Sequence, residues 1–118
     1  MRSVTLLIAA SALLAACGEG TPSPDEQATI DEVLALTGDV EAGATVYSDN
    51  CASCHAADGS GGTGPSLIEE VPETSDEEIV DIVLFGREAM PDLGLENQEV
   101  ADVLAYLRDT FGEYQGDD

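Results

Sequence analysis

Positive charge is almost absent from this chain. Among its 118 residues there is no lysine, and three arginines stand against 25 aspartates and glutamates, which gives a net charge of −22. Nucleic acid and anionic lipid head groups are poor partners for so acidic a surface. Such charge is also typical of disordered chains, but the helical periodicities described below oppose that interpretation from residue 39 onward. The acidic residues are spread along the chain. This distribution favours adaptation to high salt, rather than a local acidic tail, as the explanation of the charge.

Strands and long apolar runs are missing as well. No stretch alternates apolar and polar residues as a half-buried strand does, and there is no internal repeat. The longest apolar run, residues 4–16, is too short to cross a bilayer of about 30 Å as a helix. Because this run lies between Arg2 and Cys17, it predicts a signal peptide over residues 1–16 that ends in a lipobox, with Cys17 as the lipidated cysteine. The alternative is an ordinary signal peptide that happens to end near a cysteine.

A lipidated Cys17 predicts an exported protein, anchored to the membrane on its extracytoplasmic face. Lipidation would also explain the odd number of cysteines, since it leaves Cys51 and Cys54 as a pair. Residues 17–38 contain several Pro, Gly and acidic residues. We expect them to form a flexible acidic linker, with at most a turn or two of helix near its end.

The globular part is predicted to be one all-α domain over residues 39–118. Asp39 can cap its first helix, and Ser75 opens a Ser-x-x-Glu capping box whose helix ends at Gly86. Apolar residues at helical spacing predict a last helix over residues 97–110. So small a domain buries little apolar surface by itself, and we expect a bound group to supply part of its core.

The motif Cys51-Ala-Ser-Cys54-His55 predicts what this group is. Two thiols three residues apart on one helical turn can form thioethers with the two vinyl groups of a haem, and the adjacent imidazole can reach the iron. A zinc cage lacks a fourth Cys or His ligand in the mature chain, where lipidation of Cys17 leaves only Cys51, Cys54 and His55. A thioredoxin-like redox pair lacks its strands, and a plain disulfide leaves His55 unexplained. Covalent haem is therefore favoured over all three alternatives.

The second axial ligand of this haem is predicted to be Met90. His55 is the only histidine, so two histidines from this chain cannot bind one iron. Met90 follows a predicted helix and precedes Pro91, which holds it in an extended backbone, as suits a ligand on a stiff loop. Histidine–methionine ligation raises the reduction potential and suits electron transfer. Packing of Met90 in the core, with an open sixth coordination site, is the alternative.

Together these motifs resemble the class I c-type cytochromes, small electron carriers with a single haem. CASCH and AMPD carry the resemblance, which covers residues 39–111. It implies a cytochrome c-like fold in which the N- and C-terminal helices cross, with one covalent haem c in the core. It also implies that the carbonyl of Pro65 accepts a hydrogen bond from the imidazole of His55. The positions that match the helix crossing are Gly43, Tyr47, Val103 and Tyr106.

The resemblance implies an electron carrier rather than an enzyme, and a monomer. Its expected partners are redox proteins such as a quinol-oxidising complex, a terminal oxidase or a reductase. An electron-donor module of an oxidase or reductase complex, or a haem sensor or enzyme with an open sixth site, are the alternatives. The chain departs from the family in lacking the lysines that often surround the haem edge and any tryptophan for a haem propionate. Arg87 or Tyr114 is a candidate for the propionate role.

Overall fold

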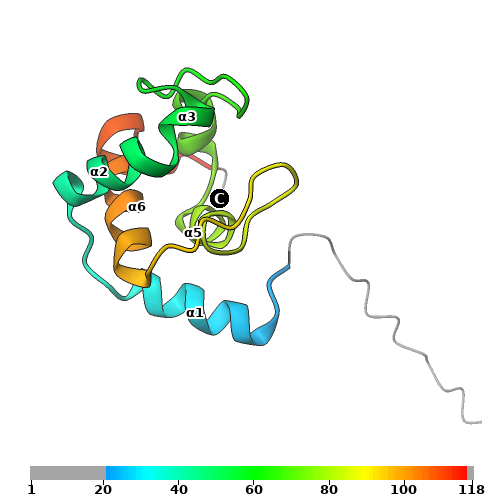
Figure 1. The fold of residues 1–118 in the computed structure, drawn as a ribbon. Coiled ribbons are helices and arrows are strands. Elements are labelled where there is room, and N and C mark those ends of the chain that lie inside the picture. Colours follow the sequence, from blue (N-terminus) through cyan, green and yellow to red (C-terminus); the bar gives the residue numbers. More distant parts are fainter. Residues whose placement is uncertain (1–20, 117–118) are drawn as a thin grey trace, which may run out of the picture.

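The structure is a computed structural model, and it describes residues 21–116. Within this range the regular secondary structure is helical, which confirms the predicted all-α class, and a single bridge between Arg87 and Met90 is the only β-type pairing. None of the described helices is long and apolar enough to span a membrane. The elements, shown in Figure 1, are α1 (Pro24–Leu34), α2 (Val40–Asn50), α3 (Ala52–His55), α4 (Leu67–Glu70), the 3-10 helix η1 (Val71–Glu73), α5 (Asp76–Phe85) and α6 (Asn97–Phe111).

Helices α2 and α6 form the most extensive helix–helix contact, and they cross as predicted. Asp39 caps α2 by accepting a hydrogen bond from the backbone N–H of Ala42 at 2.9 Å. At the crossing, a Cβ atom on Gly43 would overlap the carbonyl oxygen of Asp102, so only glycine allows this close approach. One turn further on, the rings of Tyr47 and Tyr106 lie 5.2 Å apart between centroids.

Helix α1 is a correction to the predicted linker. The sequence predicts a flexible segment with at most a turn or two of helix near its end, but residues 24–34 form one continuous helix that packs against α5 and α6. Ser23 and Glu26 form a reciprocal capping box at its start. Its inward face carries Ile30 and Val33, which are 0% and 1% exposed. Burial of these two side chains stabilises the docked helix by an amount on the order of 3 kcal/mol.

A buried arginine joins the end of α6 to η1, to Thr74 and to the first residue of α5. Arg108 is 8% exposed, and its guanidinium donates to the carboxylate of Asp76 at 2.7 Å and to the carbonyls of Val71 and Thr74, each at 2.6 Å. A buried charge is tolerated only when its donors are satisfied in this way. The half-exposed ring of Tyr114 lies 6.0 Å from the same guanidinium, at the limit of a cation–π contact.

Candidate haem-binding site

Cys51, Cys54 and His55 lie on one short helical turn. The backbone N–H groups of Cys54 and His55 both donate to the carbonyl of Cys51, at 3.1 and 3.0 Å. Cys51 is buried, Cys54 is exposed, and both thiols are free. Burial, followed by the neighbouring Cys54, raises the pKa of the Cys51 thiol to about 11. Cys51 is therefore a neutral thiol at neutral pH, unlike the low-pKa thiol of a redox enzyme.

The imidazole of His55 is held from one side by the loop that follows it. Its Nδ1 atom lies 2.9 Å from the carbonyl oxygen of Pro65, in the position predicted for this bond. If Nδ1 carries the proton, Nε2 is the ring nitrogen left with a lone pair for a metal. Gly64 packs against the ring so closely that a Cβ atom there would lie 2.6 Å from Cε1 of His55. The loop thus fixes both the tilt and the tautomer of the ring.

Backbone hydrogen bonds hold the loop of residues 56–66 in place. The N–H of Gly61 donates to the carbonyl of His55 at 3.0 Å, and that of Gly64 donates to the carbonyl of Cys54 at 2.8 Å. The hydroxyl of Tyr47, on α2, donates to the carbonyl of Ala56 at 2.6 Å. The short turn that carries the two thiols is therefore joined to both α2 and the glycine-rich loop.

Met90 lies on a second loop, residues 86–96, which joins α5 to α6 (Figure 1). Its side chain is half-buried and packs against the same hydrophobic core that contains Cys51. Its backbone exchanges two hydrogen bonds with Arg87, Met90 N–H to Arg87 carbonyl and the reverse, each at 2.9 Å. This pairing closes a tight turn in which Glu88 takes a positive φ of 51°.

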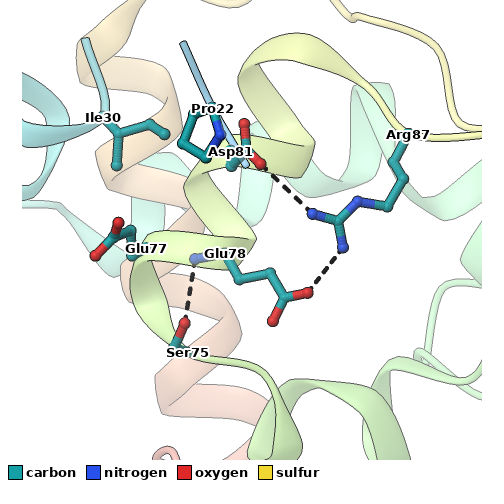
Figure 2. Close-up of a pocket in the computed structure, with 7 residues that line it drawn as sticks. All are labelled: Pro22, Ile30, Ser75, Glu77, Glu78, Asp81 and Arg87. Atoms are coloured by element: carbon teal, nitrogen blue, oxygen red, sulfur yellow. Dashed lines mark hydrogen bonds and ion pairs between the residues drawn. The ribbon is translucent and has the colours of Figure 1, made fainter. Parts of the chain in front are cut away.

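Arg87, a candidate for the propionate role, already has partners in the protein. Its guanidinium lies 2.8 Å from Oε1 of Glu78 and 3.4 Å from Oδ2 of Asp81, both on α5 (Figure 2). Burial raises the pKa of Asp81, and the nearby guanidinium of Arg87 lowers it in part. Tyr114, the other candidate, lies beside Arg108 instead.

The residues present fit a covalently bound haem. Two free thiols on one turn, an adjacent imidazole held through Nδ1, and a methionine on a separate loop that packs on the same core are the groups that such a cofactor requires.

Comparisons with known proteins agree with this fit. The family model described as cytochrome c oxidase, cbb3-type, subunit III, matches residues 38–107. The chain is 38% identical over 80 residues to the cytochrome c-553-like protein of Synechocystis sp., covering 67% of this chain and 76% of the relative. It is 30% identical over 99 residues to cytochrome c-551 of Bacillus subtilis, covering 84% and 86%. The structure of cytochrome c6 from the diatom Phaeodactylum tricornutum superposes with a TM-score of 0.56 at 33% identity, covering 63% of this chain and 95% of that one.

The chain therefore belongs to this cytochrome c family, and it is a class I monohaem c-type cytochrome. Its cofactor is one covalent haem c, for which Cys51 and Cys54 provide the attachment site. It acts in electron transfer and is not an enzyme.

Three features of the site were not predicted from the sequence. They are the contact between Gly64 and the ring of His55, the attachment of the Met90 loop to α5 through Arg87, and the bond from the Tyr47 hydroxyl to Ala56. A signal for the first exists, since Gly64 directly precedes Pro65 in the motif GTGPSL. Arg87 lies nine and six residues after Glu78 and Asp81, so no helical spacing in the sequence indicates these pairs.

Proposed function

We propose that this protein carries single electrons with His55 and Met90 as the two axial ligands of its haem. The bond from Nδ1 of His55 to the carbonyl of Pro65 is the observation that supports this most directly, because it leaves Nε2 of the same ring with a lone pair for a metal. A haem held by histidine and methionine supplies one-electron chemistry at a raised potential. The protein's part is to fill both axial positions, to attach the ring through Cys51 and Cys54, and to keep small ligands away.

Export and membrane anchoring belong to the same proposal. The predicted signal peptide, residues 1–16, and the lipidated Cys17 lie outside the described residues. Their support is the apolar run that ends in Leu-Ala-Ala-Cys. Two or more acyl chains on Cys17 would give the stable anchoring that a single chain does not. The protein would then act on the extracytoplasmic face of the membrane, beside a quinol-oxidising complex, a terminal oxidase or a reductase.

The charge distribution restricts how such partners bind. Arg87 and Arg108 are the two arginines in residues 21–116, and both are paired with carboxylates. The described surface thus offers no free cation to an acidic partner. We expect a partner whose docking face is cationic or apolar, or a docking that takes place in salt strong enough to screen the charge.

A second candidate function is that of an electron-donor module bound permanently to an oxidase or reductase. The observation that favours it is the matched family model, whose description is that of an oxidase subunit. Solubilisation of native membranes in mild detergent, followed by size-exclusion chromatography, separates the two candidates. Elution with a large complex would favour the module, and elution as a small monomer would favour the mobile carrier.

The first experiment is a visible spectrum of protein produced in a host that attaches haem c. A sharp low-spin reduced spectrum, with a ferric sulfur-to-iron charge-transfer band, would support ligation by His55 and Met90. A high-spin spectrum with retained haem would reject Met90 as ligand and favour a sensor or enzyme with an open sixth site. The matched variant Met90→Ala should lose the charge-transfer band but keep its haem through acid-acetone extraction, because the thioethers are unchanged.

A further inference from the structure

The loop that carries Met90 leaves α5 through a sharp turn. At Gly86 the backbone has a φ of +77°, and a Cβ atom there would lie 2.7 Å from the carbonyl oxygen of Met90. The chain thus folds back over the end of the helix, where only glycine fits. The next residue, Arg87, pairs with Met90 through the two backbone hydrogen bonds described above. The position of Met90 is therefore set by the position of Arg87.

The side chain of Arg87 is in turn fixed to α5. It bridges Glu78 and Asp81, which lie one turn apart on the same face of the helix (Figure 2). The side chain of Arg87 is 34% exposed, that of Glu78 is 48% exposed and that of Asp81 is 17% exposed. This group of three charges stands at the edge of a pocket of about 180 Å³, between α5 and the start of α1.

We propose that Arg87 is a positioning residue for the methionine ligand, acting through a clasp formed by Arg87, Glu78 and Asp81. The clasp holds the second residue of the loop, Arg87, against α5, and the backbone pairing passes this constraint on to Met90. Without it, the loop keeps its sequence and its methionine but opens more often. This inference rests on the ligation by Met90 proposed above.

The test is the rate at which imidazole displaces Met90 from the ferric protein, since this ligand can enter only when the loop opens. In Arg87→Gln we expect the rate to rise about fivefold, because two partly exposed ion pairs are lost. The double variant Glu78→Gln with Asp81→Asn should give a similar rise. Arg87→Gln makes the chain more negative and the double variant makes it less negative. If the clasp holds the loop, the rate of imidazole entry should rise in both variants. If only the overall charge of the chain matters, the rate should rise in one variant and fall in the other.

Glu77→Gln is the matched control. Glu77 is an exposed carboxylate beside Glu78 on the same helix and lines the same pocket, but it makes no bond to Arg87. Its variant should bind imidazole at the wild-type rate. An unchanged rate in Arg87→Gln, or equal rates in Arg87→Gln and Glu77→Gln, would overturn the proposal.

Amide hydrogen exchange in the reduced protein provides a readout that can be measured whether or not Met90 is the iron ligand. The N–H of Met90, bonded to the carbonyl of Arg87, should exchange about fivefold faster in Arg87→Gln, while the N–H of Gly64 should not change. A wild-type protein without the charge-transfer band would reject Met90 as ligand. The exchange rates would still decide whether the clasp holds the loop, so the two failures are distinguishable.

Discussion

The loops that present His55 and Met90 are held in different ways. Residues 56–66 are fixed by backbone hydrogen bonds, by the hydroxyl of Tyr47 and by direct contact of Gly64 with the ring of His55. Residues 86–96 are held by packing of Met90 and Leu95 on the core, by one backbone pairing, by a bond from the N–H of Gly94 to Asp92, and by ion pairs that are partly open to water. The first kind of support is local, short-ranged and insensitive to salt. The second is weaker and can be tuned by the solvent.

This difference indicates that the two loops have different roles in holding the haem. The His55 side has to be in place for the cofactor to be attached and oriented. The Met90 side only has to stay closed during electron transfer, and so it can tolerate a looser attachment. Predictions that disturb one loop and spare the other test this difference in roles.

The largest effect is expected on the His55 side, from Gly64→Ala. The added Cβ atom would lie 2.6 Å from Cε1 and 2.8 Å from Nδ1 of the ring, so His55 must turn and lose its bond to Pro65. We expect the free energy of unfolding to fall by about 3 kcal/mol in denaturant titrations, with a poor yield of haem-loaded protein. The control is Gly62→Ala, whose nearest contact would be 3.3 Å, and it should be nearly neutral. Equal losses in both variants would show that the ring contact is unimportant.

On the Met90 side, Gly86→Ala should have the next largest effect. A positive φ costs a non-glycine residue about 1–2 kcal/mol, and the added atom would also crowd the carbonyl oxygen of Met90 at 2.7 Å. We expect loss of the charge-transfer band while the bond between His55 and Pro65 survives. Gly94→Ala is the matched control, since Gly94 also has a positive φ (+66°) but no atom within 4 Å of an added Cβ. It should lose stability but keep the band, and loss of the band there too would argue against a specific role of the turn.

A smaller effect is expected from Tyr47→Phe, which removes the hydroxyl bond to Ala56. The cost should be about 1 kcal/mol at neutral pH. Burial, followed by the neighbouring Cys51, Tyr106 and Asp58, raises the pKa of Tyr47 to about 12.

This raised pKa means that the fold favours the neutral phenol. Its contribution to stability is fully present below about pH 10, the ordinary tyrosine pKa, and is lost as the pH rises through about 12. Between these pH values, the free energy of unfolding should therefore fall more steeply with rising pH in the wild type than in Tyr47→Phe. Tyr106→Phe is the control, because the described part of the chain shows no hydrogen bond from its hydroxyl. If Tyr47→Phe shows the same dependence of stability on pH as the wild type, the loss of stability above about pH 10 does not come from Tyr47.

The smallest effect is that of salt. Raising NaCl from 0.1 to 1 M shortens the Debye length from about 10 to about 3 Å and weakens the exposed ion pairs of Arg87. At pH 8, where imidazole is neutral, we expect its rate of entry to rise about twofold. The melting temperature should rise at the same time, since salt screens the repulsion within a chain of net charge −22. A rate that falls with salt would show that ion pairs do not hold the loop.

Local patterns in the sequence predicted most of this architecture, and tertiary contacts explain what they missed. The cap at Asp39, the crossing at Gly43 and the long last helix follow from local signals or from the family resemblance. The full length and the docking of helix α1 were missed because its Pro- and acid-rich start resembles a linker. Its Ser-Pro-Asp-Glu cap and its two buried aliphatic residues can be recognised as parts of a stable helix only once α1 is seen to pack against α5 and α6.

The features of the haem site also fall into those that local motifs or the family resemblance predict and those that depend on tertiary contacts. CASCH is a local motif, so the sequence reveals its geometry directly. The bond from His55 to Pro65 followed from the family resemblance, and the structure shows it. The contact of Gly64 with the ring and the ion pairs of Arg87 depend on how the loops fold back, which no spacing in the sequence specifies.

The docked position of α1 sets how far the domain could reach from a membrane. A chain that was flexible through residue 38 would let a lipid-anchored head swing widely. Because α1 begins at Pro24 and is packed into the fold, only residues 18–23 separate it from Cys17. Fully extended, they span about 20 Å. With Cys17 lipidated, as we propose, the domain would stay close to the bilayer with the start of α1 nearest to it. Its search for partners would then be two-dimensional, among proteins whose redox centres lie at that height.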